Sequence, residues 1–402
     1  MLGRVVIHGH VAPGFGRVAD AFSENFRRRG ELGASFCATL EGEAVVDIWA
    51  GVAHPESRAA WRADTLSTLF SATKGLAATC LLMAADRGKL DYDAPVTRYW
   101  PEFGRAGKGE ISVRTLLNHR AGVVGFDAPL TLADFDQRPE RVLEAMQEQA
   151  PVWSPGTDQG YHGVSFGPYA GELFRRVMGE SLGAFLAREV AGPLNAELHL
   201  GLPAELEERV ATMVPSPTLE RLTQALPKLL FSRGLDGRVY RQVAKKGTDT
   251  RRAFAHPADL GLSGLQNFNS RRVHRLELPW ANGLGNARGL SRLYAALASG
   301  GELGGVRLVR PESVEPLRER QSWVERDRVL RKPLGFAQGF IKEETRLFSP
   351  NAAAFGHPGA GGTLGFADPD AKLGIGYVMN QMAHQIRSPR AIALCHALYR
   401  CL

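Results

Sequence analysis

The chain has 402 residues, 44% of them hydrophobic, so it can bury one large composite core or two ordinary ones, and disorder is excluded as its general state. Its 49 Lys and Arg against 42 Asp and Glu leave a net charge of +7, a small excess that favours solubility over a nucleic-acid partner. Residues 1–15 lack the pattern of a signal peptide, and no apolar run near a helix is long enough to span a bilayer. Cys37, Cys80, Cys395 and Cys401 show no C-x-x-C spacing. We therefore expect a cytoplasmic protein with reduced thiols, without a metal or cofactor and without a membrane partner.

The chain then divides by its hydrophobic pattern. Residues 33–52 hold two short runs rich in Phe, Val and Ile around Glu41-Gly42-Glu43, which predicts a β-hairpin. Residues 71–89 have the spacing of a buried helix. From about 112 to 300 the pattern is mainly helical, with repeated Gly and Pro breaks. After 334 we expect three or four short strands and a final helix at roughly 385–399.

This order of elements predicts an α/β fold of the α+β type. We expect one mainly antiparallel sheet, flanked by helices, with strands from both chain ends and an inserted, mainly helical lobe. The sheet subdomain would comprise residues 1–75 and 300–402, and the helical subdomain residues 76–299. Residues 233–275 form a basic excursion, interpreted either as a solvated, mobile segment or as a basic lid that recruits anionic substrates.

Two serines are candidates for a nucleophile. Ser165 lies in Gly163-Val164-Ser165-Phe166-Gly167, which matches the G-x-S-x-G signature of the α/β-hydrolase nucleophile elbow. That elbow needs a buried strand directly before the serine. The preceding residues, PVWSPGTDQGYH, are rich in Pro, Gly and polar groups, which indicates a loop. We therefore do not expect a nucleophile elbow at Ser165, and we expect the glycines around it to serve backbone geometry.

Ser71 is the second candidate, in LSTLFSATKGLAA. Ser71 and Lys74 are three residues apart, so on a helix they share one face. A serine near a helix N-terminus lies where amides and the helix dipole favour negative charge. The apolar residues after Lys74 predict a buried amine with a lowered pKa, which can accept a proton. An N-cap serine followed by a surface lysine would give the same spacing.

Further segments give the S-x-x-K pair its context. The SATKG box resembles that of the serine β-lactamase and penicillin-binding-protein superfamily, and other segments match in the same order. These are VRTLLNHRAGV (113–123), PGTDQGYH (155–162) and FGHPGAGGTLGFADPDAKLGIGYVMN (355–380). The resemblance covers about residues 30–395 and is greatest to the class C-like branch with the family VIII carboxylesterases. It implies a β-lactamase/transpeptidase-like fold.

The resemblance also implies roles for the matching residues. Ser71 would be the nucleophile, Lys74 its proton acceptor and Tyr161 a second acid/base group that protonates the leaving oxygen. Whether Lys74 or Tyr161 is the first base stays open. The backbone N–H groups of Ser71 and Ala360 would form the oxyanion hole. The remaining residues proposed to contact substrate are His357, Gly359, His162, Trp280 and Asn282.

Two departures from the family pattern concern the substrate. Penicillin-recognising enzymes usually carry Asn two positions after the tyrosine, where this chain has Gly163. The hydroxyl of their third motif is replaced by Pro358, which offers neither a hydroxyl nor an N–H. Each missing contact to a substrate that needs it costs about 1–3 kcal/mol. We therefore expect a small-molecule ester substrate, with weak β-lactam hydrolysis at most.

The same residues are compatible with other functions. A β-lactamase, a D-aminopeptidase or amidase, or an acyltransferase would use the same residues, because pocket shape and water access decide between them. A catalytically silent binding protein is a further alternative, against which the presence of Ser71, Lys74 and Tyr161 argues. The last alternative is an α/β-hydrolase that uses Ser165 as its nucleophile.

Overall fold

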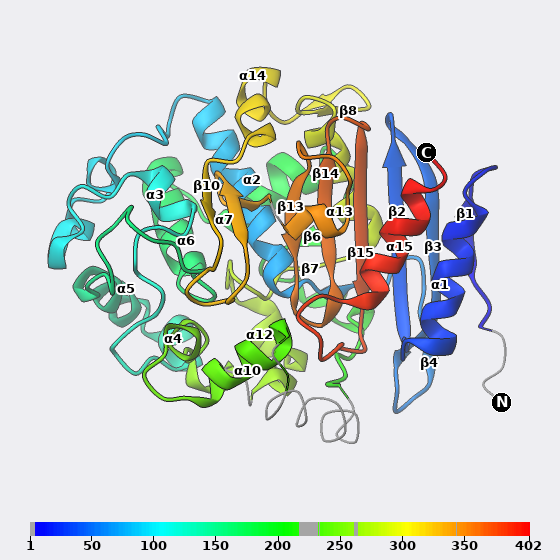
Figure 1. Ribbon diagram of the computed structural model, residues 1–402, viewed down its shortest axis with the longest axis horizontal. Coiled ribbons are helices and arrows are strands. Elements are labelled where there is room, and N and C mark those ends of the chain that lie inside the picture. Colours follow the sequence, from blue (N-terminus) through cyan, green and yellow to red (C-terminus); the bar gives the residue numbers. More distant parts are fainter. Residues whose placement is uncertain (1–4, 217–231, 233, 261–263, 343) are drawn as a thin grey trace.

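The protein is built around a mixed α/β core with a helical lobe at its side (Figure 1). The computed structural model describes residues 5–216, 232, 234–260, 264–342 and 344–402. Residues 217–231, for which the sequence predicts part of the helical stretch, lie outside the described residues, as do four positions of the basic excursion. Within the described residues, no helix is both long and apolar enough to cross a membrane.

A ten-stranded antiparallel sheet joins the two chain ends, as the sequence predicts. Its central pairing is between β2 and β15, and the strands run in the order β1-β3-β2-β15-β14-β13-β12-β11-β10, with β4 on β3. The strands are β1 (His8–Val11), β2 (Gly33–Leu40), β3 (Glu43–His54), β4 (Ala59–Ala60), β10 (Ser322–Val324), β11 (Leu334–Ala337), β12 (Phe340–Ile341), β13 (Phe355–Pro358), β14 (Leu364–Asp368) and β15 (Leu373–Met379).

The predicted hairpin is confirmed by β2 and β3. Leu40 pairs with Glu43, so the connection is the two residues Glu41 and Gly42. Both have positive φ, 49° and 90°, as the tight turn between two right-twisted strands requires. Gly42 adopts this conformation without a Cβ penalty, which explains the glycine at the tip of the hairpin.

Two helical layers cover the sheet. Helices α1 (Gly16–Arg28) and α15 (Pro389–Tyr399) lie side by side on one face (Figure 1). Helix α13 (Ala287–Ala298) packs on β2, β14 and β15. The alternation of β15 explains this arrangement, because Gly374 and Gly376 meet the backbone of α13 while Ile375 and Tyr377 join the core under α1 and α15. The final helix begins at Pro389, later than predicted, with Ser388 as its N-cap.

The inserted lobe is mainly helical, as predicted. Helix α2 (Thr73–Asp86) runs through its centre, is buried from Thr73 to Ala84, and packs against α6 (Phe166–Met178) and β13. The other helices are α3 (Val113–Leu117), α4 (Leu132–Gln137), α5 (Pro139–Glu148), α7 (Leu182–Phe185), α10 (Leu235–Ala244), α11 (Asp249–Ala253), α12 (Arg271–Arg275) and α14 (Pro311–Val314). Short strands form two small sheets, β5 (Ser67–Thr68) with β7 (Leu284–Gly285) and β6 (Leu198–His199), and β8 (Glu302–Leu303) with β9 (Val306–Arg307).

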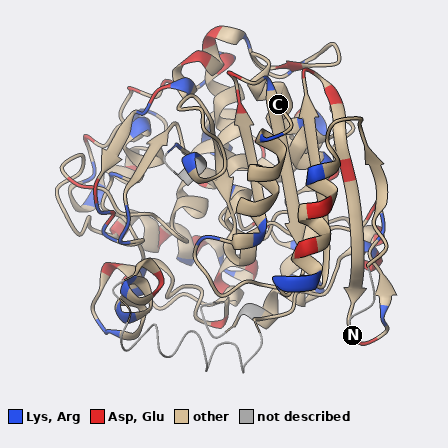
Figure 2. Ribbon diagram, turned by 45° about the vertical axis from the view of Figure 1, so that its right-hand side comes forward, with Lys and Arg blue, Asp and Glu red and all other residues tan. Residues whose placement is uncertain are grey.

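Several short helices connect these elements. Most are 3-10 helices, and η4 has π-type hydrogen bonding. They are η1 (Phe70–Ala72), η2 (Val96–Arg98), η3 (Pro101–Gly107), η4 (Leu186–Ala191), η5 (Ala204–Arg209), η7 (Ala258–Leu260), η8 (Leu265–Asn269), η9 (Glu315–Arg318), η10 (Glu344–Leu347) and η11 (Ala360–Gly362). Acidic and basic residues are interspersed along the ribbon in the view of Figure 2, which fits the small net charge.

Candidate active site

Ser71 lies in η1, the turn that leads directly into α2. The preceding residue, Phe70, has φ = 45°, a left-handed conformation that a bulky side chain rarely adopts. The Phe70 ring is buried and lies 5.1 Å from the ring of Phe268, so packing holds this strained residue in place. The turn places Ser71 on the wall of a cavity at the N-terminal end of α2.

Lys74 follows one turn later and is fully buried. Its Nζ lies 3.4 Å from Ser71 Oγ and donates to the Trp280 carbonyl at 3.0 Å. Burial disfavours the charged amine and holds the pKa of Lys74 well below its ordinary value. With one N–H directed to the Trp280 carbonyl, a neutral Lys74 keeps its lone pair available to the Ser71 hydroxyl.

Two other buried lysines have different surroundings. Lys108 Nζ donates to the carbonyls of Arg105, Gln147 and Gln149 at 2.6–2.8 Å. Lys342 Nζ donates to the carbonyls of Leu317, Arg318 and Ala353 at 2.8–2.9 Å. Each of these amines therefore has three carbonyl acceptors, which is the environment of a structural lysine. Lys74, in contrast, faces a hydroxyl.

Tyr161 completes the cluster from the loop before α6. Its hydroxyl hydrogen-bonds to the Ser71 side chain and lies 3.5 Å from His357 Nε2. Lys74 Nζ is 5.0 Å from the centre of the phenol ring. Burial raises the pKa of Tyr161 above its ordinary value, opposed by the Ser71 hydrogen bond. The phenol is therefore protonated at neutral pH and can act as an acid.

His357, on β13, lines the cavity beside Tyr161. Its Nδ1 donates to the Pro358 carbonyl at 2.8 Å, which leaves Nε2 as an acceptor toward the Tyr161 hydroxyl. Burial, followed by the nearby Lys74, lowers the pKa of His357 to about 3. The imidazole is therefore neutral, and it orients the phenol proton without adding positive charge.

The turn after β13 brings Ala360 to the same cavity as Ser71. A Cβ on Gly359 would lie 2.3 Å from the Leu69 carbonyl oxygen, two residues before the candidate nucleophile. Only glycine permits this approach of the turn to η1. Gly359 thus explains how the backbones of Ser71 and Ala360, 289 positions apart in the sequence, reach one cavity.

The cavity itself measures about 360 Å³, within the usual range for small-molecule sites. Its polar wall carries Ser71, Tyr161, Lys332 and His357. Most of the remaining lining is apolar, and it comprises Phe70, Val164, Val239, Val243, Phe254, Leu260, Phe268, Trp280, Ala281, Leu330, Ile341, Pro358, Met382 and Ile386. Burial lowers the pKa of Lys332 to about 7.

Part of this wall comes from the predicted basic excursion. Helix α10 contributes Val239, Tyr240 and Val243 to the cavity. The Tyr240 hydroxyl donates to the His384 carbonyl, and Ile386 N donates to Asp236 at 3.2 Å, so α10 is attached to the loop that precedes α15. The α10 side chains that line the cavity are thus apolar or phenolic. Several arginines of the excursion instead pair with acids outside the cavity, including Arg252 with Asp127 and Arg272 with Asp136.

Two residues expected to contact substrate do not line this cavity. Asn282 is buried, and its side chain accepts from Leu278 N and donates to the carbonyls of Val273 and Leu276 at 2.7–2.9 Å. It shapes the loop that presents the Trp280 carbonyl. His162 is also buried, and its ring lies 5.2 Å from His119, behind Tyr161. Trp280 does line the cavity.

Ser165 is placed away from the cavity. Its Oγ is buried and donates to the Val123 carbonyl at 2.5 Å, and the residue precedes α6. No strand leads into it, as its sequence predicts. Gly163, two positions earlier, leaves no room for a side chain, because a Cβ there would lie 2.5 Å from the Phe254 ring and 2.9 Å from the Ala253 carbonyl oxygen.

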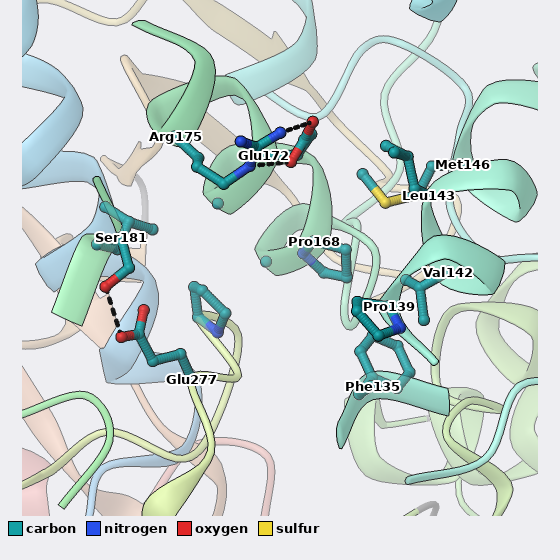
Figure 3. A pocket seen from close by; sticks show the side chains of 14 residues that line it. Phe135, Pro139, Val142, Leu143, Met146, Pro168, Glu172, Arg175, Ser181 and Glu277 are labelled. Atoms are coloured by element: carbon teal, nitrogen blue, oxygen red, sulfur yellow. Dashed lines mark hydrogen bonds and ion pairs between the residues drawn. The ribbon is translucent and has the colours of Figure 1, made fainter. Parts of the chain in front are cut away.

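A second, smaller hollow of about 230 Å³ lies on the helical lobe (Figure 3). Phe135, Val142 and Met146 line one side of it, and Glu172, Arg175 and Glu277 lie at its polar side. It contains none of the candidate site residues. No group of three or more His, Cys, Asp or Glu suited to a metal ion occurs among the described residues.

Comparison with known proteins gives matches along nearly the whole chain. A family model described as beta-lactamase matches residues 18–395. Esterase/beta-lactamase LipL of Mycobacterium tuberculosis is 32% identical over 381 residues, which are 94% of this chain and 83% of LipL. Among solved structures, a family VIII carboxylesterase has a TM-score of 0.86 at 40% identity, covering 99% of this chain and 100% of its own. A penicillin-binding protein homologue from Caulobacter crescentus has a TM-score of 0.84 at 34% identity, with the same coverage.

Proposed function

The chain belongs to the beta-lactamase family and is a serine hydrolase, and from that premise we propose that it cleaves carboxylic esters through an acyl-enzyme on Ser71. The observation that carries the proposal is the position of the Ser71 hydroxyl, between the buried Lys74 amine and the Tyr161 phenol. A hydroxyl is a weak nucleophile unless a base takes its proton, and a neutral amine within reach is such a base. The mainly apolar cavity around it suits the acyl or alcohol part of an ester.

In the proposed acylation step, Ser71 Oγ attacks the ester carbonyl as its proton moves to Lys74 Nζ. The backbone N–H groups of Ser71 and Ala360 stabilise the oxyanion that forms. Collapse of the intermediate breaks the bond to the alcohol oxygen, which receives a proton from the Tyr161 hydroxyl. Before this exchange, His357 Nε2 accepts from the phenol and holds it in place. The products of this step are the free alcohol and the acyl-enzyme.

Deacylation reverses the roles. A water molecule takes the place of the alcohol, loses its proton to the phenolate, and attacks the acyl carbonyl. Ser71 then leaves as the alkoxide and recovers its proton from Lys74. Base and acid are thereby restored to their starting states. Their coupled titrations belong to the Ser71–Lys74–Tyr161 cluster as a whole.

An ester is favoured over a β-lactam by the surroundings of the cluster. The site that holds Asn in penicillin-recognising enzymes is Gly163, and the Phe254 ring fills the space that such a side chain would need. Pro358 likewise offers no hydroxyl. Hydrolysis of β-lactams is the second candidate function, favoured by the name of the relative LipL, in which esterase and beta-lactamase stand together.

The proposal is tested on purified protein with a fluorophosphonate probe and two chromogenic substrates. We expect the probe to label Ser71, identified by mass spectrometry, and Ser71→Ala to abolish labelling and turnover of p-nitrophenyl butyrate. Ser165→Ala should retain both. Turnover of nitrocefin with a higher kcat/KM than the ester would contradict the ester assignment, and labelling that persists in Ser71→Ala would contradict the choice of nucleophile.

A cytoplasmic location is also part of the proposal. All four cysteines are free and three of them are buried, an arrangement compatible with a reducing compartment. A small-molecule ester is the only partner that the proposed function requires.

A further inference from the structure

The loop that carries Tyr161 has no regular secondary structure from residue 149 to residue 165. Its backbone N–H groups therefore lack the ladder of a helix or sheet and need other partners. The direction of the Tyr161 phenol therefore depends on how firmly hydrogen bonds hold the backbone of this loop. The hydrogen-bond partners of the amides at and next to Tyr161 therefore affect the position of its phenol.

Asp327 provides the first of these partners. Its side chain is fully buried, and the Tyr161 N–H contacts both carboxylate oxygens, at 3.2 and 3.1 Å. One of these oxygens also accepts the N–H groups of Val329 and Leu330 at 2.9 and 2.8 Å. A single carboxylate therefore holds its own loop and the Tyr161 loop together.

His119 provides the second partner, from the turn after α3. Its Nδ1 accepts the N–H of His162 at 2.9 Å, and its carbonyl accepts the N–H of Gly160 at 3.1 Å. The His119 ring also lies 5.1 Å from the Tyr161 ring and 4.3 Å from the Phe336 ring. The consecutive amides of residues 161 and 162 are thus bound by side chains from two segments distant in sequence.

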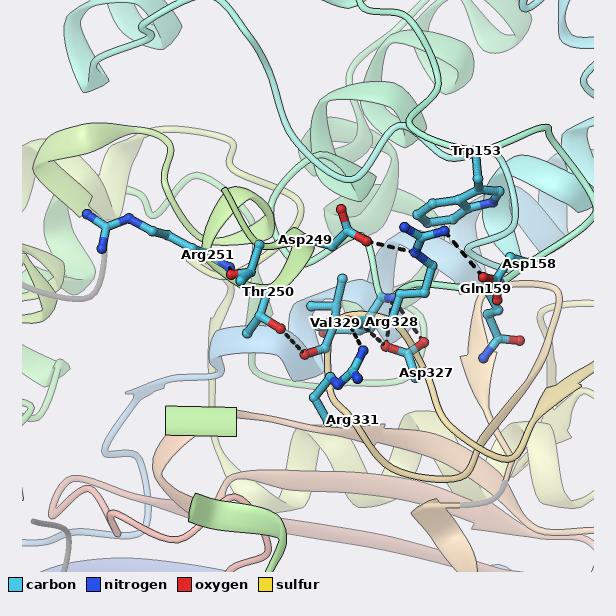
Figure 4. A network of polar contacts seen from close by, with 12 residues as sticks. Trp153, Asp158, Gln159, Asp249, Thr250, Arg251, Asp327, Arg328, Val329 and Arg331 are labelled. Carbon is cyan, nitrogen blue, oxygen red and sulfur yellow. Dashed lines mark hydrogen bonds and ion pairs between the residues drawn. The ribbon is translucent and has the colours of Figure 1, made fainter. Parts of the chain in front are cut away.

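The surrounding network stabilises the Asp327 loop without contacting those two amides. Arg328 pairs with Asp249 at 2.7 Å and Asp158 at 3.4 Å, and Thr250 Oγ1 donates to the Val329 carbonyl at 2.7 Å (Figure 4). These contacts offer a comparison within the same loop. Their loss affects the stability of the loop but leaves the acceptors of the Tyr161 and His162 amides in place.

We propose that Asp327 and His119 are positioning residues for Tyr161, which set the direction of its phenol by binding the consecutive amides of residues 161 and 162. The inference rests on the proposed function, in which Tyr161 gives its proton to the leaving alcohol. Displacement of a reacting group by about 1 Å can lower a rate by as much as 10²-fold. Loss of either acceptor therefore acts on the protonation step specifically.

The test uses Asp327→Asn and two esters with the same acyl group, ethyl butyrate and p-nitrophenyl butyrate. Ethoxide needs a proton to leave, whereas p-nitrophenolate leaves without one, and kcat/KM for each ester reports acylation alone. In the variant, an amide NH₂ replaces one acceptor oxygen and faces an N–H donor. We expect kcat/KM to fall about tenfold or more for ethyl butyrate and less than about threefold for p-nitrophenyl butyrate.

Three further variants keep the outcome interpretable. Thr250→Val removes a buried hydrogen bond from the same loop and should lower kcat/KM equally, if at all, for both esters. His119→Leu should show the selective loss, and His119→Asn, which keeps an acceptor and tolerates the positive φ of 59°, should restore the ethyl ester. If Asp327→Asn fails to fold, the comparison of His119→Leu with His119→Asn still tests the positioning role.

Tyr161→Phe separates this inference from the proposed function. If Tyr161→Phe loses activity selectively on ethyl butyrate while Asp327→Asn and His119→Leu affect both esters alike, the positioning role is wrong. If Tyr161→Phe itself shows no selectivity between the esters, the acid role of Tyr161 is wrong and the inference falls with it.

Discussion

Replacement of Lys74 by Met is the most direct test of the proposed base. Met fills a similar volume but has no amine, so the Ser71 hydroxyl loses the acceptor that lies 3.4 Å away. General-base assistance contributes about 10²–10⁴ in rate, which is about 2.7–5.4 kcal/mol of transition-state stabilisation. We expect kcat/KM for p-nitrophenyl butyrate to decrease by a factor of about 10²–10⁴. Stability should change little, because the Trp280 carbonyl loses a partner, at a cost of about 1–3 kcal/mol, while a costly buried amine is removed.

The pH profile gives the same test a second readout. Lys74 must be neutral to accept a proton, so activity of the wild type is lost as pH falls through the pKa of Lys74. Because burial lowers that pKa, the active plateau should begin well below the pKa of an ordinary lysine. Lys74→Met should remove this acidic limb. The matched control is Lys108→Met, which removes another buried amine, with its three carbonyl acceptors, away from the cavity and should retain both rate and pH profile. A Lys74→Met variant that keeps more than about a tenth of wild-type kcat/KM with an unchanged acidic limb would refute the role of Lys74.

Four further predictions follow from the contacts around the site. Gly359→Ala should lower both the melting temperature and kcat/KM, because its Cβ would lie 2.3 Å from the Leu69 carbonyl oxygen and must displace the turn that carries Ala360; unchanged kinetics would contradict this. Gly163→Asn should destabilise the protein without raising kcat/KM for nitrocefin, and a gain in that value would show that Phe254 is not the obstacle. Ser165→Ala should keep its esterase activity and lose about 1 kcal/mol of unfolding free energy from its bond to the Val123 carbonyl, measured by denaturant titration. Val243→Trp should lower kcat/KM for p-nitrophenyl octanoate more than for the butyrate, since it fills the cavity from α10, and an equal effect on both esters would place the acyl chain elsewhere.

The parts of the site that lie close together in sequence could be predicted best. Ser71 and Lys74 are one helical turn apart, and α2, which follows Ser71 and carries Lys74, is buried on all sides from Thr73 to Ala84. The burial of Lys74 and its proximity to Ser71 therefore follow from local spacing. The β2–β3 hairpin has an equally local cause in Glu41-Gly42. The choice between Ser71 and Ser165 also depended on local pattern, because loop residues precede Ser165.

The partners of Tyr161 could not be predicted. Asp327 is 166 residues away from Tyr161 in sequence and stands in SWVERDRVL, a segment without a motif. His119 lies within the quoted LLNHRAGV segment, but nothing in that pattern tells where its ring points. Asn282 was expected at the substrate, yet an asparagine near a bend binds its own backbone just as readily, as it does here.

The apolar side of the basic excursion, residues 233–275, could not be predicted for a different reason. Its many arginines dominate the sequence and suggest a charged surface over the site. The sequence does indicate a short apolar stripe on α10, because Val239 and Val243 are four residues apart and Tyr240 lies between them. A stripe of three residues is a weak indication. Among so many basic residues, this short apolar stripe does not by itself predict that α10 lines a cavity.

Helix α10 lines the cavity but supplies none of the proposed catalytic residues, which has a consequence for substrate specificity. The proposed catalytic residues Ser71, Lys74 and Tyr161 lie on η1, on α2 and on the loop before α6. A separate part of the cavity wall comes from α10, which is fastened at Tyr240 and Asp236. We therefore expect changes in the side chains of α10 to alter which esters fit the cavity while the proposed catalytic groups stay in place. Acyl specificity and the proposed reaction can therefore be altered separately in this chain, the first through the side chains of α10 and the second through Ser71, Lys74 and Tyr161.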